Sequence, residues 1–347
     1  MGKFVTMALV VALLMGGLYG ACSWDATDSE PEDPTPVTPS PHLPDEEEDE
    51  DETTAGPPWP TERALPTALL VSYGNNPQAR PQTGLEQADL VYEVLAEGGI
   101  TRLMGLFNTY APEEIGPIRS MRQCLVEIAM GHDSPFAHAG GSMEALASIR
   151  RLNAKSLDEI YGAGNYFWRS SQRRPPDNLY TSAEKLLAGA TARGFGETPL
   201  PEFPSGRLSG GETATTVVVD YSRSTAFPNR ISYTWEDGLY WREINHSPHI
   251  STSSGDQLAP HNLLFLETTT REFVRDGDPM VEIDVIGQGA ALLFRDGQSY
   301  QASWKKTDIN GPFTFTLTAS GEPLKLTPGQ VWIHLVPSLD YVKVDED

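Results

Sequence analysis

The chain has 347 residues, room for two ordinary domains with terminal segments, and its 48 acidic residues against 25 lysines and arginines give a net charge of −23. This charge argues against nucleic acid as a partner, because neutralising phosphates requires clustered lysine and arginine. The two cysteines, Cys22 and Cys124, are too few for a disulfide-rich fold.

Residues 1–22 have the pattern of a secretory signal. Lys3 supplies a positive charge, Phe4–Leu14 is apolar, and small residues precede Cys22. The apolar run is too short for a permanent transmembrane span. The end of the segment resembles a bacterial lipobox, although Tyr19 stands where an aliphatic residue is usual. We therefore expect an extracytoplasmic lipoprotein held on the lipid bilayer through Cys22; an ordinary secreted protein is the alternative.

The next segment is strongly acidic. Residues 23–56 contain 13 acidic residues and no lysine or arginine, with proline and threonine between them. A segment of this composition cannot bury apolar surface and repels itself, so residues 23–64 are predicted to form a disordered tether. Because residues 1–22 carry +1 and residues 23–56 carry −13, a charge of −11 remains for residues 57–347.

Residues 65–196 mix strand and helix patterns and predict an α/β domain. The expected elements are a buried strand at Ala68–Ser72, a hairpin of residues 90–97 and 100–107, a helix from Gly116-Pro117 to about Met130, a strand and glycine turn at Phe136–Ser142, a helix at Met143–Arg151, and a helix that starts from the capping box Thr181–Glu184. Cys124 lies in the first predicted helix, which favours a buried, unreactive thiol.

The predicted hairpin concentrates charge where a core should lie. If its turn consists of Gly98 and Gly99, Arg102 pairs with Leu95. Side chains alternate along a strand, so Glu93, Glu97 and Arg102 would then share one face. This arrangement predicts a functional cluster or an internal ion network.

Two more arginines follow the hairpin. Arg119 and Arg122 lie three residues apart, on one flank of the predicted helix near its positive end. Cations at that end oppose the helix dipole, which favours a functional role over surface solubility. His138 precedes the glycine turn and is a candidate ligand-binding residue, an acid–base group or a hydrogen-bonded core histidine.

Residues 161–180 form a long loop rich in glycine, aromatic residues and arginine. Trp168 and Arg169 could stack on and pair with an acidic or sugar-bearing ligand, with Asn178 close by in sequence. The alternative is a packed aromatic loop covered by surface arginines.

The pattern changes in the second half. Residues 197–212 carry repeated glycine and proline and predict a linker, and residues 213–347 contain nine short strand candidates without a comparable helix. Asp237-Gly238 and Asp296-Gly297 predict tight hairpin turns. We therefore expect a mainly antiparallel β domain, and an α+β protein overall. The spacing of His246, His249 and His261 matches no metal pattern, so neither a metal nor a cofactor is expected.

The chain resembles the YerB-like bacterial lipoproteins, a two-domain family of unassigned biochemical function. The resemblance rests on Ala79–Leu85, Ala88–Arg102, Gly116–Arg122, His138–Ser142, Pro176–Tyr180, Phe294–Gly297, Trp304–Lys306 and Pro328–Ile333. This chain has Asp177 where the family usually has histidine, and it lacks the aspartate that the family carries near residues 72–75. The resemblance implies a surface lipoprotein with an α/β first domain and a β second domain, but no particular reaction.

Three functional hypotheses follow. The first is binding of an anionic cell-envelope molecule, a carboxylate or phosphate, by Arg80, Arg102, Arg119, Arg122, His138, Trp168, Arg169 and Asn178. The second is a hydrolase of wall glycan or peptide that uses Glu93 and Glu97 as acid and base. The third takes the charged hairpin as a structural ion network.

Overall fold

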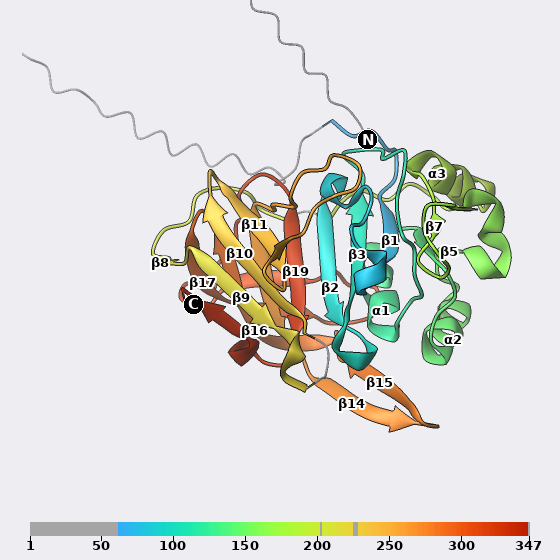
Figure 1. The fold of residues 1–347 in the computed structure, drawn as a ribbon. Helices are drawn as coiled ribbons and strands as arrows, with labels where there is room; N and C mark the ends of the chain where they lie inside the picture. Colours follow the sequence, from blue (N-terminus) through green and yellow to red (C-terminus); the bar gives the residue numbers. More distant parts are fainter. Residues whose placement is uncertain (1–61, 202, 225–227, 346–347) are drawn as a thin grey trace, which may run out of the picture. The chain divides into compact units, whose positions relative to one another are not determined.

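The computed structural model describes residues 62–201, 203–224 and 228–345 (Figure 1). The signal segment with Cys22, and all but the last residues of the predicted tether, lie outside the described residues. Within the described part of the chain, no helix has the length and apolar character needed to cross a membrane.

The largest element is an eleven-stranded sheet with the order β18-β17-β16-β13-β19-β2-β3-β1-β4-β5, in which β8 also pairs with β17. Its strands are β1 Leu69–Gly74, β2 Leu90–Leu95, β3 Thr101–Phe107, β4 Phe136–His138, β5 Ser156–Asp158, β8 Glu212–Thr213, β13 Asn262–Glu267, β16 Gly287–Arg295, β17 Gln298–Lys306, β18 Thr314–Leu317 and β19 Val331–Val336.

Strand β19 joins the two halves of the chain. It pairs in parallel with β13 on one side and with β2 on the other, so one sheet runs through both halves. Every residue of β2 and β19 is buried. Strands covered on both faces are usually continuous apolar runs, as the Val-Trp-Ile-His-Leu-Val sequence of β19 nearly is. Glu93 of β2 and His334 of β19 are polar residues in these buried strands, so each must have a polar partner in the interior.

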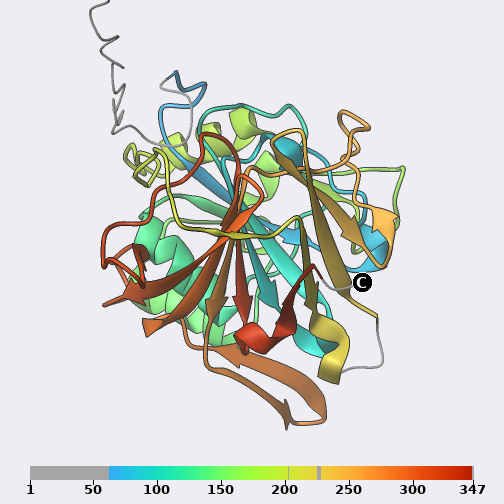
Figure 2. The same cartoon turned by 90° about the vertical axis from the view of Figure 1, so that its left-hand side faces the viewer.

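A five-stranded sheet, β12-β11-β10-β9-β20, lies on one side of the central sheet, and helices lie on the other (Figures 1 and 2). Its strands are β9 Thr216–Asp220, β10 Arg230–Glu236, β11 Leu239–Ile244, β12 Ser247–Pro248 and β20 Val342–Val344, and the remaining pairs are β6 Trp168–Arg169 with β7 Leu179–Tyr180 and β14 Thr270–Arg275 with β15 Asp278–Ile283.

The predicted Asp-Gly turns are present. Asp237-Gly238 joins β10 to β11, Asp296-Gly297 joins β16 to β17, and all four residues have positive φ. Asp276-Gly277 makes a third such turn between β14 and β15, a signal that the sequence analysis missed. The β14–β15 hairpin extends beyond the end of the central sheet in both views (Figures 1 and 2).

The three α-helices of the described residues are α1 Gln123–His132, α2 Met143–Leu152 and α3 Ala183–Ala192. The predicted start of the first helix at Gly116-Pro117 is wrong. The segment before Gln123 is extended, and its backbone bonds to strands that flank it: Ile118 N donates to Leu179 O at 2.8 Å and Arg119 N to Ser72 O at 2.9 Å. These tertiary hydrogen bonds outweigh the helical spacing of its apolar side chains.

The β2–β3 register is shifted by one residue from the prediction. Arg102 pairs with Val94, and Glu93 pairs with Leu103. Because side chains alternate between faces, this shift moves Arg102 to the face opposite Glu93. The predicted common face for these two residues is therefore wrong.

The turn explains the shift. It contains three residues, Glu97, Gly98 and Gly99, and is closed by a 2.8 Å hydrogen bond from Ala96 N to Ile100 O. Both glycines have positive φ, 74° and 75°, a conformation that residues with a Cβ rarely adopt. Compared with the predicted two-residue turn, a three-residue turn shifts the strand pairing by one residue and so changes which side chains share a face.

Candidate functional site

The β2–β3 hairpin presents two different charged surfaces. The Tyr92 hydroxyl hydrogen-bonds His132 of α1 at 2.8 Å, which identifies one face as the helix side. The carboxylate of the next residue, Glu93, contacts Arg242 of β11 at 2.8 Å on the side of the five-stranded sheet. Arg102 shares the helix side with Tyr92, because Arg102 pairs with Val94.

On the sheet side, Glu93 is the centre of a buried polar network. Its carboxylate accepts hydrogen bonds from Arg242 Nη2 at 2.8 Å, Thr101 Oγ1 at 2.6 Å and Asn75 Nδ2 at 3.3 Å. The side chains of Glu93 and Arg242 are both fully shielded from solvent. Arg242 also lies over the Trp332 ring, 4.3 Å from its centroid.

Two histidines extend this network across the two halves of the chain. His249 accepts from Arg242 Nε at 2.9 Å through Nδ1, and its Nε2 donates to Gln82 Oε1 at 2.6 Å. His334 bonds the hydroxyls of Tyr221 at 3.1 Å and Tyr233 at 2.8 Å. We call Glu93, Arg242, His249 and His334 with these partners the Glu93 network. Its polar atoms are paired, as buried polar groups must be.

The histidines make the fold sensitive to acid. Burial lowers the pKa of His138, His249 and His334, so all three stay neutral in the folded chain. In the unfolded chain they bind protons below about pH 6.5. Stability present above that pH is therefore lost as the pH falls, by up to about 1.4 kcal/mol per histidine and pH unit. We expect the melting temperature to fall steeply between pH 7 and 5 in circular dichroism; a flat profile would contradict neutral buried histidines.

On the helix side, three guanidinium groups gather into what we call the arginine cluster, Arg102, Arg119 and Arg122. Arg122 is paired with Glu97 by two hydrogen bonds of 2.6 Å. Arg119 lies 3.8 Å from Asp177, a long ion pair. Arg102 is only 3 % exposed, and its Nε has no hydrogen-bond partner among the described residues.

The electrostatics of Arg102 follow from this arrangement. Burial, followed by the charges of Arg122 and Arg119, lowers its pKa to about 9, and attraction from Glu97 and Asp177 does not compensate. Two carboxylates thus face three guanidinium groups. The cluster carries an uncompensated positive charge, which is the electrostatic requirement of an anion site.

Asp177 belongs to the same surface. It accepts a 3.2 Å hydrogen bond from Asn76 Nδ2, and its Oδ1 is buried without a hydrogen-bond partner. Next to it, a Cβ at Gly74 would lie 2.8 Å from Arg119 Cγ. The two positions at which the sequence departs from the resembled family are therefore close together, beside Arg119.

The other candidate residues lie elsewhere. His138 is fully buried, and its ring bonds Gly140 O at 2.7 Å and Ser156 Oγ at 2.8 Å. Both nitrogens are thus already in use. Arg80 is half-buried, with an unpartnered Nε, and it lies towards Arg242 and Glu93 rather than the arginine cluster.

Trp168, Arg169 and Asn178 form a local unit on the β6–β7 pair. Arg169 donates to Asn178 Oδ1 at 3.0 Å, and the Asn178 amide donates to Ser170 O at 3.1 Å. Trp168 stacks on Tyr180 with ring centroids 6.3 Å apart. Arg169 also forms an ion pair with Glu159, which precedes this pair of strands, at 3.4 Å.

Two adjoining cavities, of about 140 and 600 Å³, open beside Arg122; Arg102 and Arg119 line neither of them. Both are lined by Glu97, Arg122, Ser142, Glu144 and Met280, so they form one groove between the starts of α1 and α2 and the β14–β15 hairpin. Arg275 of the hairpin forms an ion pair with Glu144 across the groove.

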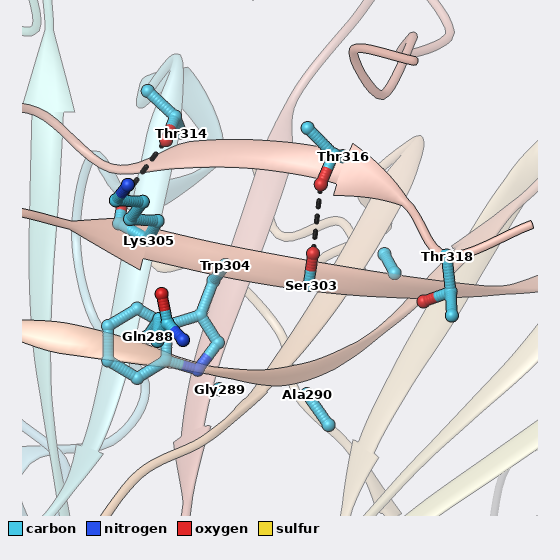
Figure 3. Close-up of a pocket in the computed structure, with 10 residues that line it drawn as sticks. Gln288, Gly289, Ala290, Ser303, Trp304, Lys305, Thr314, Thr316 and Thr318 are labelled. Atoms are coloured by element: carbon cyan, nitrogen blue, oxygen red, sulfur yellow. Dashed lines mark hydrogen bonds between the residues drawn. The ribbon is translucent and has the colours of Figure 1, made fainter. Parts of the chain in front are cut away.

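A third cavity, of about 490 Å³, lies on β16, β17 and β18 (Figure 3). Several of its polar side chains are already paired: Ser303 Oγ lies 2.8 Å from Thr316 Oγ1, and Trp304 Nε1 donates to Glu267 O at 2.8 Å. The charged side chain that lines it, Lys305, is exposed, whereas Arg102 is buried.

Cys124 lies at the inner end of the 140 Å³ cavity, and burial raises the pKa of its thiol to about 12. It therefore remains protonated and unreactive at neutral pH. Among the described residues, no group of three or more histidine, cysteine, aspartate or glutamate side chains is placed to hold a metal ion.

Both halves of the chain match domains of one known protein family. Residues 54–196 match the N-terminal domain, and residues 217–333 the C-terminal domain, of a family described as "Protein of unknown function (DUF3048)". The chain is 32% identical over 291 residues to "Putative lipoprotein YerB" of Bacillus subtilis (strain 168), covering 82% of this chain and 85% of YerB. The crystal structure of YerB matches with a TM-score of 0.72 at 31% identity, covering 82% of this chain and 95% of that one. The chain therefore belongs to the two-domain DUF3048 family and is homologous to YerB.

Proposed function

We propose that this protein is an extracytoplasmic lipoprotein, anchored through Cys22, that binds an anionic cell-envelope molecule at the arginine cluster. The anchor is supported by the signal pattern before Cys22 and by the lipoprotein name of the relative. The binding site consists of Arg102, Arg119 and Arg122, with Asp177 and Glu97 holding two of the three guanidinium groups in place.

The observation that carries this proposal is the state of Arg102. Arg102 is 3 % exposed, and its Nε is buried without a hydrogen-bond partner among the described residues. Desolvation of a charged group is costly, and folded proteins rarely leave such a group unpaired unless it is used. A bound carboxylate or phosphate would accept its hydrogen bonds in a bidentate geometry and neutralise the excess charge.

The hydrolase hypothesis has less support. Glu93 is sealed from solvent and paired with Arg242 at 2.8 Å, so it cannot reach a substrate. Burial raises the pKa of Glu97, but the hydrogen bonds and charge of Arg122 outweigh burial, and the net pKa lies below the ordinary value. A general acid for glycoside hydrolysis needs a raised pKa. We therefore do not propose these two glutamates as a catalytic pair.

Binding should be measured on the full-length chain by isothermal titration with citrate, sulfate and inorganic phosphate at constant ionic strength. We expect at least one anion to bind, and replacement of Arg102 by methionine to weaken that binding by more than about tenfold, because one charge-assisted hydrogen bond contributes about 1.5–3 kcal/mol.

The matched control is Arg207→Met, which removes an exposed arginine in the second half of the chain. It changes the net charge equally and should leave the affinity within about twofold. Equal losses in both variants would show a diffuse charge effect rather than a site, and no binding by any anion would remove the proposal.

A further inference from the structure

We propose that the ligand of the arginine cluster is an α-hydroxy carboxylate. Its carboxylate binds between Arg102 and Arg119, and the hydroxyl on the neighbouring carbon donates to the acceptors formed by Asn76 and Asp177. None of these four residues lines the groove beside Arg122. This inference rests on the proposed function and narrows the ligand class.

Four buried polar atoms at the arginine cluster have no hydrogen-bond partner among the described residues. Two are donors, the Nε atoms of Arg102 and Arg119, and two are acceptors, Asn76 Oδ1 and Asp177 Oδ1. Arg102 is 3 % exposed, and Asp177 is 6 % exposed. Folded chains pair nearly all of their buried polar atoms, so four unpaired ones around a single point are unusual. Together they call for a ligand that presents both an acceptor and a donor.

Gly74 is the point at which these side chains meet. It pairs with Arg102 across β1 and β3, so the two residues face the same side of the sheet. A Cβ at Gly74 would lie 2.8 Å from Arg119 Cγ and 3.3 Å from Asn76 Oδ1. Both side chains therefore occupy the space over Gly74, next to Arg102. The Arg119 side chain is 25 % exposed, so a small molecule can reach this place from solvent.

Asp177 brings an unpaired acceptor close to an unpaired donor. Its Oδ1 lies 3.8 Å from Arg119 Nε, which is too far for a hydrogen bond. Its Oδ2 accepts from Asn76 Nδ2 at 3.2 Å, and this contact identifies the unpaired Asn76 atom as the carbonyl oxygen. An oxygen and an O–H group on neighbouring carbons of one ligand are close enough together to meet both atoms of the Arg119–Asp177 pair. The hydroxyl therefore belongs on the carbon next to the carboxylate.

The charge balance favours a hydroxyl over an ammonium group. The three guanidinium groups of the cluster face the carboxylates of Glu97 and Asp177, which leaves one positive charge. A hydroxy carboxylate carries one negative charge and neutralises it. An α-amino acid carries no net charge, and its ammonium group would add a fourth cation beside the three arginines.

The test compares small acids on the full-length chain by calorimetric titration. Lactate has its hydroxyl on the carbon next to the carboxylate, its isomer 3-hydroxypropionate has it one carbon further away, and propionate has none. We expect at least one enantiomer of lactate to bind at least about tenfold more tightly than propionate, because a hydrogen bond to a charged group contributes that much. We expect 3-hydroxypropionate and alanine to bind less tightly than lactate.

Two variants assign the effect. Asn76→Ala with Asp177→Ala removes both acceptors, so the lactate-to-propionate ratio of affinities should fall to within about threefold while propionate still binds. Retained propionate binding also shows that the double variant folds. Arg102→Met should weaken the binding of both acids.

The outcomes separate this inference from the proposed function. If lactate does not bind, if 3-hydroxypropionate, alanine or propionate binds as tightly as lactate, or if the preference for lactate survives the double substitution, the α-hydroxy carboxylate is wrong and the arginine cluster remains a site for other anions. Anion binding that is independent of Arg102 would overturn both.

Discussion

Replacement of Arg242 by methionine is expected to destabilise the protein by about 3–5 kcal/mol, the largest stability loss that we predict. The substitution leaves Glu93 fully buried without its ion-pair partner, and removing one partner of a buried ion pair costs this much in other proteins. It also removes the donor to His249 Nδ1 and the contact with Trp332. Urea unfolding monitored by tryptophan fluorescence measures the change.

The control for this prediction is Arg271→Met, which breaks an exposed ion pair with Asp284 and should have little effect on stability. The double variant Glu93→Gln with Arg242→Met should recover part of the loss, since no ionised group is then left unpaired. If Arg242→Met costs no more than the control, the Glu93 network does not hold the two halves of the chain together.

Replacement of Arg102 by methionine should have the opposite effect on stability and the largest effect on binding. The Nε of Arg102 is buried without a hydrogen-bond partner among the described residues, and the nearby carboxylates of Glu97 and Asp177 lie against other arginines. An apolar side chain of similar length therefore removes a desolvation cost without orphaning a carboxylate. We expect the free energy of unfolding to rise by about 1–4 kcal/mol and anion binding to weaken by more than about tenfold. The same urea titration, together with calorimetric titration, measures both.

Arg102→Lys distinguishes charge from geometry. Lysine keeps the positive charge but loses the planar guanidinium that pairs with two oxygens, so binding should weaken without disappearing. A loss of several kcal/mol of stability in Arg102→Met would contradict the proposal, because it would mean that Arg102 has a structural partner within the protein.

The sequence by itself identified the elements whose signals are local. Apolar runs marked the strands of the central sheet. Asp237-Gly238 and Asp296-Gly297 marked two hairpins, because a tight turn needs positive φ at both central residues and Asp-Gly is one of the few dipeptides that adopt it. The residues of the arginine cluster were all among the candidates. Arg102 was selected for the charge on the predicted hairpin, which needs no knowledge of the fold. Arg119 and Arg122 were selected for their expected place near the positive end of a helix, although α1 begins only at Gln123.

Only the tertiary structure decided which of those charges meet. The Gly-Gly pair is compatible with a turn of two residues or of three. The third residue of the Glu97–Gly99 turn places Arg102 on the face opposite Glu93. The true partner of Glu93, Arg242, lies 149 residues further along the chain, on a strand that reaches Glu93 only when the five-stranded sheet packs on the face formed by β2 and β19. The extended path of Arg119 before α1 likewise depends on hydrogen bonds to β1. Pairings at such separations leave no local pattern, because they are selected by the burial of whole faces rather than by neighbouring residues.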